Sequence, residues 1–454
     1  MPDPKAKLDP AVQSTGLFNE DLCTRCGTCG GACPTGAIRF NERRFPAIDL
    51  DLCTSCGLCN RVCPGDKVSY GKLAQLTFGV DERLPSFDGH TLKTYVGYCT
   101  DDAIRGNGAG GGVITGILAD LLKNGVVDGC IVTRMKRDRP WEGEPFIART
   151  LDDLRQSQGS RYMIIPVNDI LREVRTLPGK FALAALPCQI HGFRMLAEED
   201  PVLAAKIHVV IGLFCGGSLE PYLVPEILAT KGLKPSDIRD FQFRGGTWPG
   251  RLQAIKHDGT VVPMHNYNYD DGAYNYLTHH YAPRRCQTCL DGSGQFADLA
   301  VGDAWTRDED GNYKFFAQSR LFPRTARGME VMQAAMDRGV ISAIDVSGDP
   351  SYRTHKMATT RKGTGAPIRM RRWQTRGIAI PKYDVEFGEF TRREKINELF
   401  SAFFLWCGRH KVIRFPLLWL LTSKLSIPMI WLRRKIKKRK YAKRKKARLK
   451  AAGG

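Results

Sequence analysis

The chain has 454 residues, of which 43% are hydrophobic; this length argues against a single domain and predicts two or three, with a sizeable core. Its formal charge of +21 resembles that of a nucleic-acid-binding protein, but residues 433–450 carry thirteen Lys or Arg and no acid, leaving about +8 elsewhere. Because the excess charge is confined to one end, we expect no specific nucleic-acid partner.

Eight of the fifteen cysteines lie within the first 63 residues, in a run of four that occurs twice. The runs are Cys23-x2-Cys26-x2-Cys29-x3-Cys33-Pro34 and Cys53-x2-Cys56-x2-Cys59-x3-Cys63-Pro64. This spacing is typical of bacterial ferredoxins, in which three thiolates of a run bind one 4Fe-4S cluster and the fourth binds the other. It assigns Cys23, Cys26, Cys29 and Cys63 to one cluster, and Cys53, Cys56, Cys59 and Cys33 to the second. Zinc sites usually have a longer gap between two Cys pairs, and disulfides need an oxidising compartment, so both alternatives are disfavoured.

The two runs define an expected ferredoxin-like domain over residues 17–70, preceded by an N-terminal arm over 1–16. The arm lacks the apolar stretch of a secretory signal, and cluster assembly needs reduced thiols, so we expect a cytoplasmic protein. Residues 71–90 show no strong periodicity and predict a linker.

A second domain is expected over residues 91–345, beginning with a strand at 95–99, a Gly-rich loop at 106–112, a helix at 113–123 and a strand at 129–133. Gly106, Gly108 and Gly111 fit G-x-G-x-x-G, which places bare backbone amides at a helix N-terminus, where a phosphate binds well. No acid follows at the end of the second strand to hold a ribose, so the pattern favours a flavin or another phosphate-bearing cofactor over NAD. A structural glycine turn without a ligand stays open as the alternative.

Four cysteines of the second domain form another candidate ligand set. Cys188 and Cys215 follow predicted strands at 181–185 and 207–214, and the carboxyl ends of such strands are where α/β sheets bind ligands. Cys286-x2-Cys289 forms a knuckle further along the chain. The four could hold a third cluster; the alternatives are buried structural thiols at Cys188 and Cys215 and zinc at the knuckle.

The rest of the chain divides into an extension over 346–400 and an amphipathic, polybasic tail over 401–454. Basic residues and prolines interrupt the aromatic and leucine-rich stretches of the tail, so a clean membrane span is not expected. Apolar anchors before a polybasic run favour attachment of residues 401–450 to an anionic membrane surface, on the cytoplasmic face of the inner membrane. The alternatives are a helix packed on the body with a solvated basic end, and RNA binding.

With these features in view, residues 17–320 resemble the coenzyme F420 hydrogenase/dehydrogenase β-subunit family, whose relatives include chlorophyll-pigment reductases. The motifs that together carry the resemblance are Gly110-Gly111-Gly112-Val113-Ile114-Thr115, Ser160-Arg161-Tyr162, Leu186-Pro187-Cys188-Gln189, Ile211-Gly212-Leu213-Phe214-Cys215, Phe243-Arg244, Cys286-x2-Cys289 and Gly302-Asp303. The resemblance implies an α+β ferredoxin-like module followed by an α/β FAD-binding core. It also favours Cys188, Cys215, Cys286 and Cys289 as ligands of a third 4Fe-4S cluster. The basic amphipathic tail is not part of the family pattern.

We therefore predict a reductase or dehydrogenase that passes electrons from two 4Fe-4S clusters through FAD to an organic substrate or a deazaflavin-like coenzyme. A ferredoxin or a partner redox subunit would supply the electrons, and a homo-oligomer stays open. The expected FAD-binding residues are Gly106, Asn107, Gly108, Gly110, Gly111, Gly112, Val113, Thr115, Ser160 and Arg161, with Arg244 as a further phosphate or substrate contact. The catalytic candidates are Arg161, Tyr162 and His191, although a structural role is the simpler explanation for His191. Two other functions stay open: an electron-transfer subunit without its own substrate, and a membrane-linked accessory protein of polysaccharide assembly.

Overall fold

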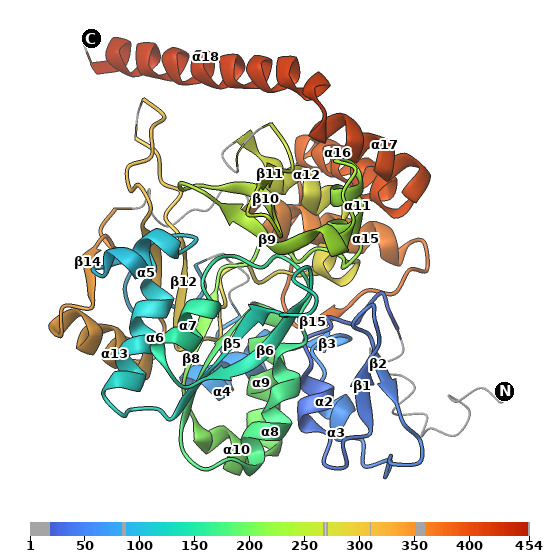
Figure 1. The fold of residues 1–454 in the computed structure, drawn as a ribbon, viewed down its shortest axis with the longest axis vertical. Coiled ribbons are helices and arrows are strands. Elements are labelled where there is room, and N and C mark those ends of the chain that lie inside the picture. The colour runs from blue at the N-terminus through green and yellow to red at the C-terminus, as the bar shows by residue number, and fades with distance from the viewer. Residues whose placement is uncertain are drawn as a thin grey trace.

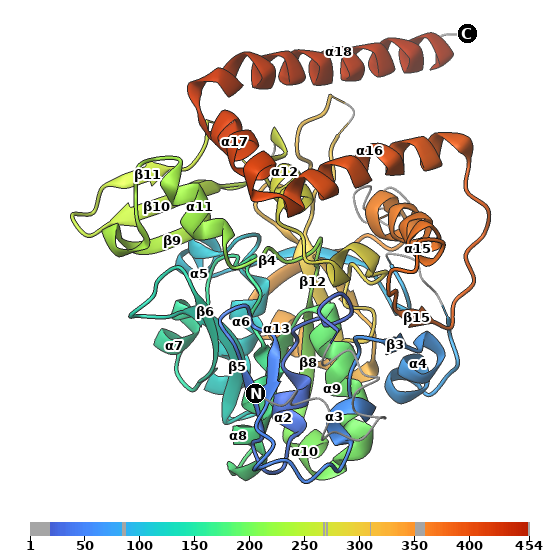
Figure 2. The same ribbon diagram turned by 90° about the vertical axis from the view of Figure 1, so that its right-hand side faces the viewer.

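The computed structural model describes residues 19–83, 88–266, 268, 271–308, 310–349 and 359–452 (Figure 1). The predicted N-terminal arm, 1–16, lies outside these residues, as do parts of the predicted linker and extension. Within the described residues, a large sheet has helices on both faces, a small cysteine-rich module lies beside it, and the last helices cross one end of the molecule (Figures 1 and 2).

In the described part of the chain the largest sheet has eight strands, in the order β14-β4-β13-β12-β8-β7-β5-β6. The neighbours β12, β8, β7 and β5 are parallel, and the other pairs are antiparallel. The strands are β4 (Tyr95–Cys99), β5 (Gly129–Met135), β6 (Gly143–Ala148), β7 (Phe181–Ala185), β8 (Ile207–Leu213), β12 (Leu299–Asp303), β13 (Ser319–Pro323) and β14 (Ile341–Asp345).

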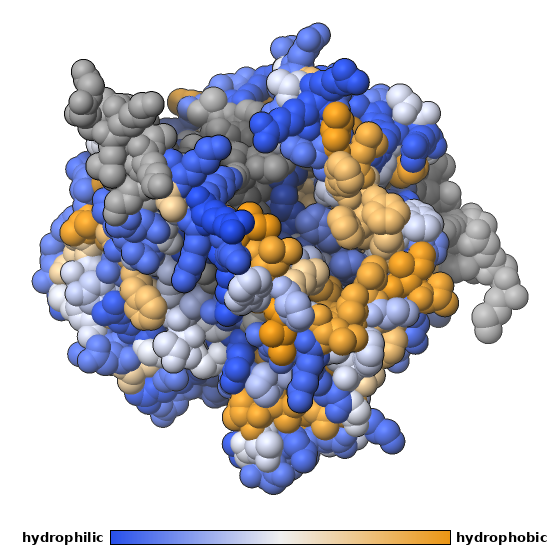
Figure 3. Space-filling model, turned by 90° about the horizontal axis from the view of Figure 1, so that it is seen from above, coloured by the Kyte–Doolittle hydropathy of each residue, from blue (hydrophilic) through white to orange (hydrophobic). Residues whose placement is uncertain are grey.

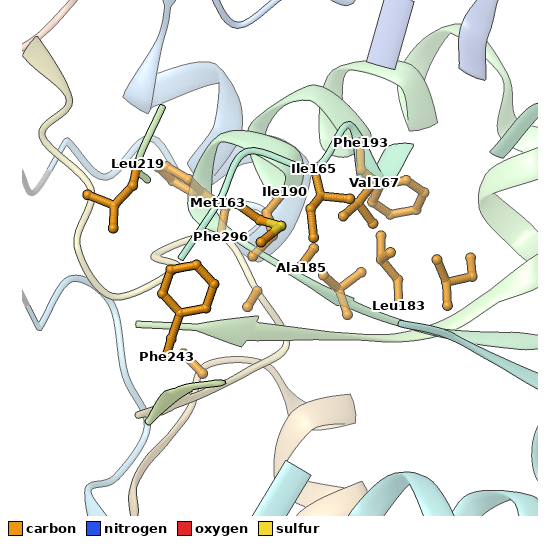
Figure 4. Close-up of a cluster of buried hydrophobic side chains, with 14 of the residues drawn as sticks. Met163, Ile165, Val167, Leu183, Ala185, Ile190, Phe193, Leu219, Phe243 and Phe296 are labelled. Atoms are coloured by element: carbon orange, nitrogen blue, oxygen red, sulfur yellow. The ribbon is translucent and has the colours of Figure 1, made fainter. Parts of the chain in front are cut away.

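The central strands are apolar on both faces because successive side chains point to opposite sides of the sheet. In β8, Val209 and Ile211 pack with helices α6 (Val113–Lys123) and α13 (Ala326–Asp337), whereas Val210 packs into the core on the other face. On that face, Ile190 and Phe193 of α9 (Pro187–Glu199) lie over β7 (Figure 4). The sheet is therefore buried between two layers of helices, as the α/β prediction requires.

The Gly-rich segment differs from the prediction in both position and topology. Helix α5 (Asp102–Asn107) follows β4 directly, with the Asp101 carboxylate accepting a hydrogen bond from the Ile104 amide, so Gly106 and Asn107 belong to a helix rather than a loop. Strand β4 lies between β13 and β14, antiparallel to both, and four strands separate it from β5. The segment therefore does not join two adjacent parallel strands as it would in a Rossmann unit.

The cysteine-rich module contains α2 (Thr28–Ala32), the hairpin of β1 (Ile38–Phe40) and β2 (Pro46–Ile48), α3 (Leu58–Arg61) and β3 (Lys67–Val68). The predicted linker, 71–90, begins instead with helix α4 (Tyr70–Phe78), in which Leu73 and Ala74 are fully buried. The helix packs against α9, but it is only nine residues long, so its periodic signal in the sequence is weak.

The C-terminal extension returns to the cysteine-rich module instead of forming a separate unit. Strand β15 (Lys382–Tyr383) pairs in parallel with β3. The Asp384 carboxylate then accepts hydrogen bonds from the amides of Tyr70 (2.6 Å) and Gly71 (3.1 Å) at the start of α4. This cap links a residue near the end of the chain to the module at its beginning.

The tail is helical, and its first helix begins before the predicted boundary at residue 401. Helix α16 (Arg392–Arg409) packs on α12 (Ala273–His280), and α17 (Lys411–Thr422) and α18 (Ile427–Ala452) follow. Among the described residues no single helix is long and apolar enough to cross a membrane, but Lys411–Thr422 and Lys424–Lys443 meet the length and composition criteria as a pair bent by 74°.

The remaining described elements complete the connections between these layers. A second sheet has the order β11-β10-β9 and lies next to α11 and α12 (Figure 2). The elements are α7 (Leu151–Gln156), η2 (Val167–Ile170), α8 (Leu171–Thr176), α10 (Pro201–Lys206), α11 (Leu223–Ala229), η3 (Pro235–Asp237), β9 (Ile238–Gly245), β10 (Arg251–Lys256), β11 (Val261–Pro263), η5 (Arg285–Thr288), the π-helix η7 (Thr359–Gly365), α15 (Ala366–Gln374) and η8 (Lys424–Ser426).

Candidate functional site

The two cysteine runs fold into the same local backbone. Arg25 and Ser55, the residues before the second cysteine of each run, have positive φ angles of 56° and 55°. Gly27 and Gly57, the residues after it, have φ angles of 91° and 71° and precede α2 and α3. Only the two glycines adopt these left-handed angles without steric cost. The sequence repeat is therefore also a structural repeat.

The thiols of the two runs lie near one another in two sets. Burial raises the pKa of Cys29, and the nearby Cys26, Cys23 and Cys63 thiols raise it further. Burial likewise raises the pKa of Cys59 to about 11, with contributions from Cys56, Cys33 and Cys53. We call Cys23, Cys26, Cys29 and Cys63 group 1, and Cys33, Cys53, Cys56 and Cys59 group 2. Each group has the four thiols that a 4Fe-4S cluster requires.

A third set of thiols meets beside the parallel strands. Cys188 lies in the first turn of α9 after β7, Cys215 follows β8, and Cys286 belongs to η5. Because β7 and β8 are parallel neighbours, their carboxyl ends bring Cys188 and Cys215 to the same edge of the sheet. Burial raises the pKa of Cys188 well above its ordinary value, and the nearby Cys26, Cys286, Cys215 and Cys289 thiols add to that shift. We call Cys188, Cys215, Cys286 and Cys289 group 3.

The described residues contain no three His, Cys, Asp or Glu side chains placed to bind one metal ion. A single tetrahedral Zn²⁺ needs its sulfur ligands within about 4 Å of one another, since each Zn–S bond is about 2.3 Å long. A four-iron cube holds its thiolates farther apart than one ion does. The donor set of group 3, four thiols with partial access to solvent, fits such a cube.

A short polar chain connects group 1 with group 3. The Asn168 side chain, which is fully buried, donates from Nδ2 to Thr28 Oγ1 (2.8 Å) and to the Gln189 carbonyl next to Cys188 (2.7 Å). Since Thr28 Oγ1 accepts this bond, its own proton is available to Cys26 Sγ, 3.2 Å away. The backbones also pack tightly here, because a Cβ on Gly31 would lie 2.0 Å from the Asn168 carbonyl oxygen.

Replacing Thr28 with Val should lower the reduction potential of the cluster in group 1. The hydroxyl stabilises the more negative, reduced form, and a hydrogen bond worth about 1 kcal/mol corresponds to about 40 mV for one electron. A redox titration followed by electron paramagnetic resonance measures the shift. Thr54→Val, an exposed position between Cys53 and Cys56, is the matched control. Equal shifts in the two variants would contradict a role for the Thr28 hydrogen bond.

Lys362, from the C-terminal extension, is buried against group 3. Its ammonium lies 3.4 Å from Cys289 Sγ and donates to the Asp291 carbonyl. Burial lowers the pKa of Lys362, but the Cys289 and Cys215 thiols and Asp291 outweigh that effect and raise it. A fixed positive charge next to four thiolates offsets part of their repulsion. Sequence reasoning missed this residue, because one basic side chain in an extension carries no motif.

A cavity of about 290 Å³ opens at the same edge of the sheet. Its wall combines the carboxyl ends of β7, β8 and β12 with the start of α6, the segment before Met163, and Arg361 and Lys362. Gly112 precedes α6 with a φ angle of 71°, and it lines the cavity together with Val113, Ile114 and Thr115. The first amides of a helix have no partner within the helix. Cys215 lines the cavity too, which places group 3 in its wall.

Most of the predicted cofactor residues lie at this cavity, but three do not. The lining includes Gly108, Gly110, Gly112, Val113, Thr115, Ser160 and Arg161, and also the catalytic candidate Tyr162. Gly106 and Asn107 end helix α5, and the Gly111 amide donates to Ser319 Oγ (3.0 Å). None of these three residues lines the cavity.

The predicted catalytic candidates have different surroundings. Arg161 lines the cavity, but its guanidinium donates to the carbonyls of Ser157 (2.8 Å) and Gln156 (2.6 Å), and burial lowers its pKa to about 10. His191 is not in the cavity wall; its Nε2 lies 2.9 Å from Asp291 Oδ2 in a buried pair. Asp291 also accepts the amides of Ser293, Gly294 and Gln295, so this pair holds the loop after Cys289 in place.

One side of the cavity is aromatic and contains an ion pair. Arg244 Nη1 donates to Asp303 Oδ2 (2.7 Å), and both residues line the cavity. Trp305, also in the wall, stacks on Trp248 with ring centroids 5.2 Å apart, and Tyr313 and Phe316 pack against Trp248. We call Trp248, Trp305, Tyr313 and Phe316 the aromatic rim. Its members come from two distant segments, so sequence order alone could not group them.

Models of three protein families match the chain in succession. Residues 17–69 match a 4Fe-4S dicluster domain; residues 94–172 and 179–348 match the N-terminal and C-terminal parts of the coenzyme F420 hydrogenase/dehydrogenase β subunit. The chain belongs to the coenzyme F420 hydrogenase/dehydrogenase β-subunit family. This confirms the predicted resemblance. The matched regions of the family end at residue 348, so Lys362 and the C-terminal helices lie beyond them.

Relatives with similar sequences include proteins of Methanocaldococcus and Methanosarcina. The chain is 27% identical to a coenzyme F420-dependent sulfite reductase of Methanocaldococcus jannaschii, over 70% of this chain but only 46% of the reductase. It is 29% identical to one of the subunits of the F(420)H(2) dehydrogenase of Methanosarcina mazei, over 64% of this chain and 78% of that relative. A protein of the F420-reducing [NiFe] hydrogenase complex of Methanosarcina barkeri has the same fold, with a TM-score of 0.51, 22% identity and coverage of 66% of this chain and 98% of that one. Iron-sulfur electron transfer within an oxidoreductase is therefore confirmed as the general class.

Proposed function

We propose that this chain is a flavin-dependent iron-sulfur oxidoreductase module, which delivers electrons from its ferredoxin-type clusters to an organic substrate or a deazaflavin-like coenzyme. The clusters supply one-electron transfer, and FAD in the cavity supplies hydride transfer. The observation that carries the proposal is the position of Cys215, which belongs to group 3 and also lines the cavity. Relatives whose names include coenzyme F420 support a deazaflavin as the acceptor.

The three thiol groups follow one another toward the cavity. Cys56 of group 2 is exposed, so this end is open to a ferredoxin or a partner subunit. The Cys59 thiol of group 2 is close enough to raise the pKa of the Cys29 thiol of group 1, so these two groups are neighbours. The Cys26 thiol of group 1 likewise raises the pKa of the Cys188 thiol of group 3, so groups 1 and 3 are also neighbours. This order supports a single route from the protein surface to the cavity wall.

The cavity wall offers donors for a phosphate-bearing cofactor. The free amides at the start of α6, together with the helix dipole, stabilise negative charge at that end. A Cβ on Gly110 would lie 3.1 Å from Asp303 Oδ1, so the glycine keeps the wall open there. Because the Arg161 guanidinium already serves two carbonyls, we assign it to shaping the wall rather than to the phosphate.

Anaerobic mixing of the cofactor-loaded protein with a reduced ferredoxin tests the proposal. We expect the clusters to be reduced first and the visible absorbance of the bound flavin to bleach afterwards, with F420 reduced when it is added as the acceptor. Reduction of the clusters while the flavin stays oxidised would contradict the proposed route. Flavin bleaching without any transfer to an added acceptor would favour the second candidate, an electron-transfer subunit that needs a partner, which the relatives named as subunits support.

We also retain the predicted peripheral attachment of residues 401–450 to an anionic membrane surface. Exposed apolar side chains and basic residues lie on neighbouring helices of that segment.

A further inference from the structure

The C-terminal helices carry a surface that the proposed redox chemistry does not use. Large apolar side chains are exposed on α16, α17, η8 and the start of α18, including Phe400 (65%), Leu425 (64%) and Trp431 (60%). Seen from above, hydrophobic residues gather on this end of the molecule with hydrophilic residues around them (Figure 3). Exposed apolar area on this scale usually marks an interaction site. We call the exposed apolar residues of 396–436 the apolar face.

Beyond Glu398, the charge of the C-terminal helices has a single sign. No Asp or Glu follows Glu398 in the sequence, whereas thirteen Lys or Arg lie within 433–450. On α18 the described basic side chains beyond Leu432 are mostly exposed, among them Lys438, Lys440 and Lys443. An apolar face that continues into a row of cations complements an anionic lipid surface, in which the apolar groups enter the headgroup region and the cations remain at the phosphates.

The apolar face is held rigidly on the body of the protein. Arg414 of α17 donates from Nε and Nη2 to the Glu226 carboxylate (2.9 and 2.7 Å) in a buried pair. Arg369 does the same with Glu398 of α16 (2.8 and 2.7 Å). A Cβ on Gly408 would lie 2.4 Å from the His280 carbonyl oxygen, so α16 and α12 touch through their backbones. The face therefore has one fixed orientation relative to the sheet.

Two further contacts place the aromatic rim next to the basic helix α18. Arg434 of α18 donates twice to Asp271 (2.8 and 2.5 Å), ahead of α12. A Cβ on Gly311 would lie 2.8 Å from the Tyr441 ring, so α18 lies directly on the loop that carries Tyr313 and Phe316 of the aromatic rim. Both ribbon views show this loop reaching from the end of the sheet toward α18 (Figures 1 and 2).

We propose that α16, α17 and α18 dock the protein on an anionic bilayer in one orientation, with the aromatic rim of the cavity turned toward the lipid. The docking itself does not depend on the cofactors. That the docked cavity reduces an acceptor at the membrane rests on the proposed function, in which the cavity is the redox site. The bent pair of α17 and α18 lies in the interface rather than across it. A span would bury several cations of Lys424–Lys443 in hydrocarbon.

Vesicle sedimentation of the full chain tests the docking. The native protein should bind phosphatidylcholine vesicles containing phosphatidylserine and not phosphatidylcholine alone. Changing Lys437, Lys438, Lys440 and Lys443 to Gln should weaken binding about 600-fold, since each of the four surface cations contributes about fivefold. The triple variant Phe400→Ser, Leu425→Ser and Trp431→Ser should lose binding as well. Binding that is unchanged in both variants would overturn the proposal.

Matched controls separate the apolar face from general surface effects. Val202→Ser removes an equally exposed apolar side chain from α10, at the opposite end of the molecule (Figures 1 and 2), and should bind like the native protein. Replacing Lys180, Lys234, Arg239 and Lys382 with Gln gives the same net charge as the tail variant and should weaken binding far less. A native dimer that the triple variant converts to a monomer without vesicles would overturn the proposal, since a second copy would then cover the face.

Hydrogen exchange on vesicles tests the orientation. We expect slower exchange in 396–406 and 419–432, and also in the rim loop 310–316, with no change in α10. Protection of the helices without protection of 310–316 would overturn the orientation. Resistance to extraction at alkaline pH would overturn the interfacial position. Iron and flavin content, measured on the same samples, keeps a failure of docking distinct from a failure of the proposed redox function.

Discussion

Changing Cys188 to Ser should remove the third cluster and leave the other two. We expect iron per chain to fall from about twelve to about eight, because each 4Fe-4S cluster contains four irons and group 3 loses one of its four thiolates. Bound FAD should remain, but ferredoxin should no longer reduce it, since Cys188 is the thiol of group 3 that lies near Cys26 of group 1. Iron analysis and anaerobic flavin reduction measure both effects.

Cys130→Ser is the control for this variant. Cys130 is fully buried in β5, where burial alone raises its pKa to about 12, and its thiol faces the Leu118 carbonyl. The control should keep its iron and its flavin reduction. A Cys188→Ser protein with unchanged iron would show that group 3 binds no cluster, and zinc in the native protein would point to the knuckle of Cys286 and Cys289 instead.

Replacing Arg414 with Met should destabilise the C-terminal helices strongly. The substitution leaves the buried Glu226 carboxylate with Tyr281 Oη (2.7 Å) as its remaining partner, and breaking a buried ion pair on one side typically costs about 3–5 kcal/mol. We expect a lower denaturant midpoint and faster proteolysis within α16 and α17. The clusters should be retained, because these helices lie outside the three thiol groups.

The double variant Arg414→Met with Glu226→Gln tests the reason for this loss. Removing the unpaired charge should restore a large part of the stability, since the cost comes from an isolated buried carboxylate rather than from lost packing. Equal destabilisation in the single and double variants would mean that the contact of the Arg414 guanidinium with the Tyr222 and Tyr281 rings contributes most of the effect.

Short-range signals in the sequence were sufficient to predict the cysteine-rich module and the central strands. The spacing of the two runs determines the local turns, since Gly27 and Gly57 repeat the same backbone. The apolar run before Cys188 predicted β7, and the periodicity after Gly112 predicted α6 with its bounds. These features depend on neighbours along the chain, so a single sequence contains them.

Features that depend on distant contacts were not predictable in the same way. The position of β4 between β13 and β14 is decided by pairing partners more than 200 residues away, and it moves Gly106 and Asn107 out of the cavity wall. Lys362 reaches group 3 because β15 and Asp384 tie the extension to the cysteine-rich module. Neither pairing leaves a local pattern in the sequence. No signal therefore indicated that the extension packs on the cysteine-rich module.

Iron, acid-labile sulfide, zinc and flavin per chain on anaerobically purified protein test the central claim most directly. Three clusters beside one flavin site predict about twelve irons, about twelve sulfides and one FAD, with no zinc. Eight irons with one zinc would contradict the third cluster, and irons without flavin would contradict the assignment of the cavity to FAD.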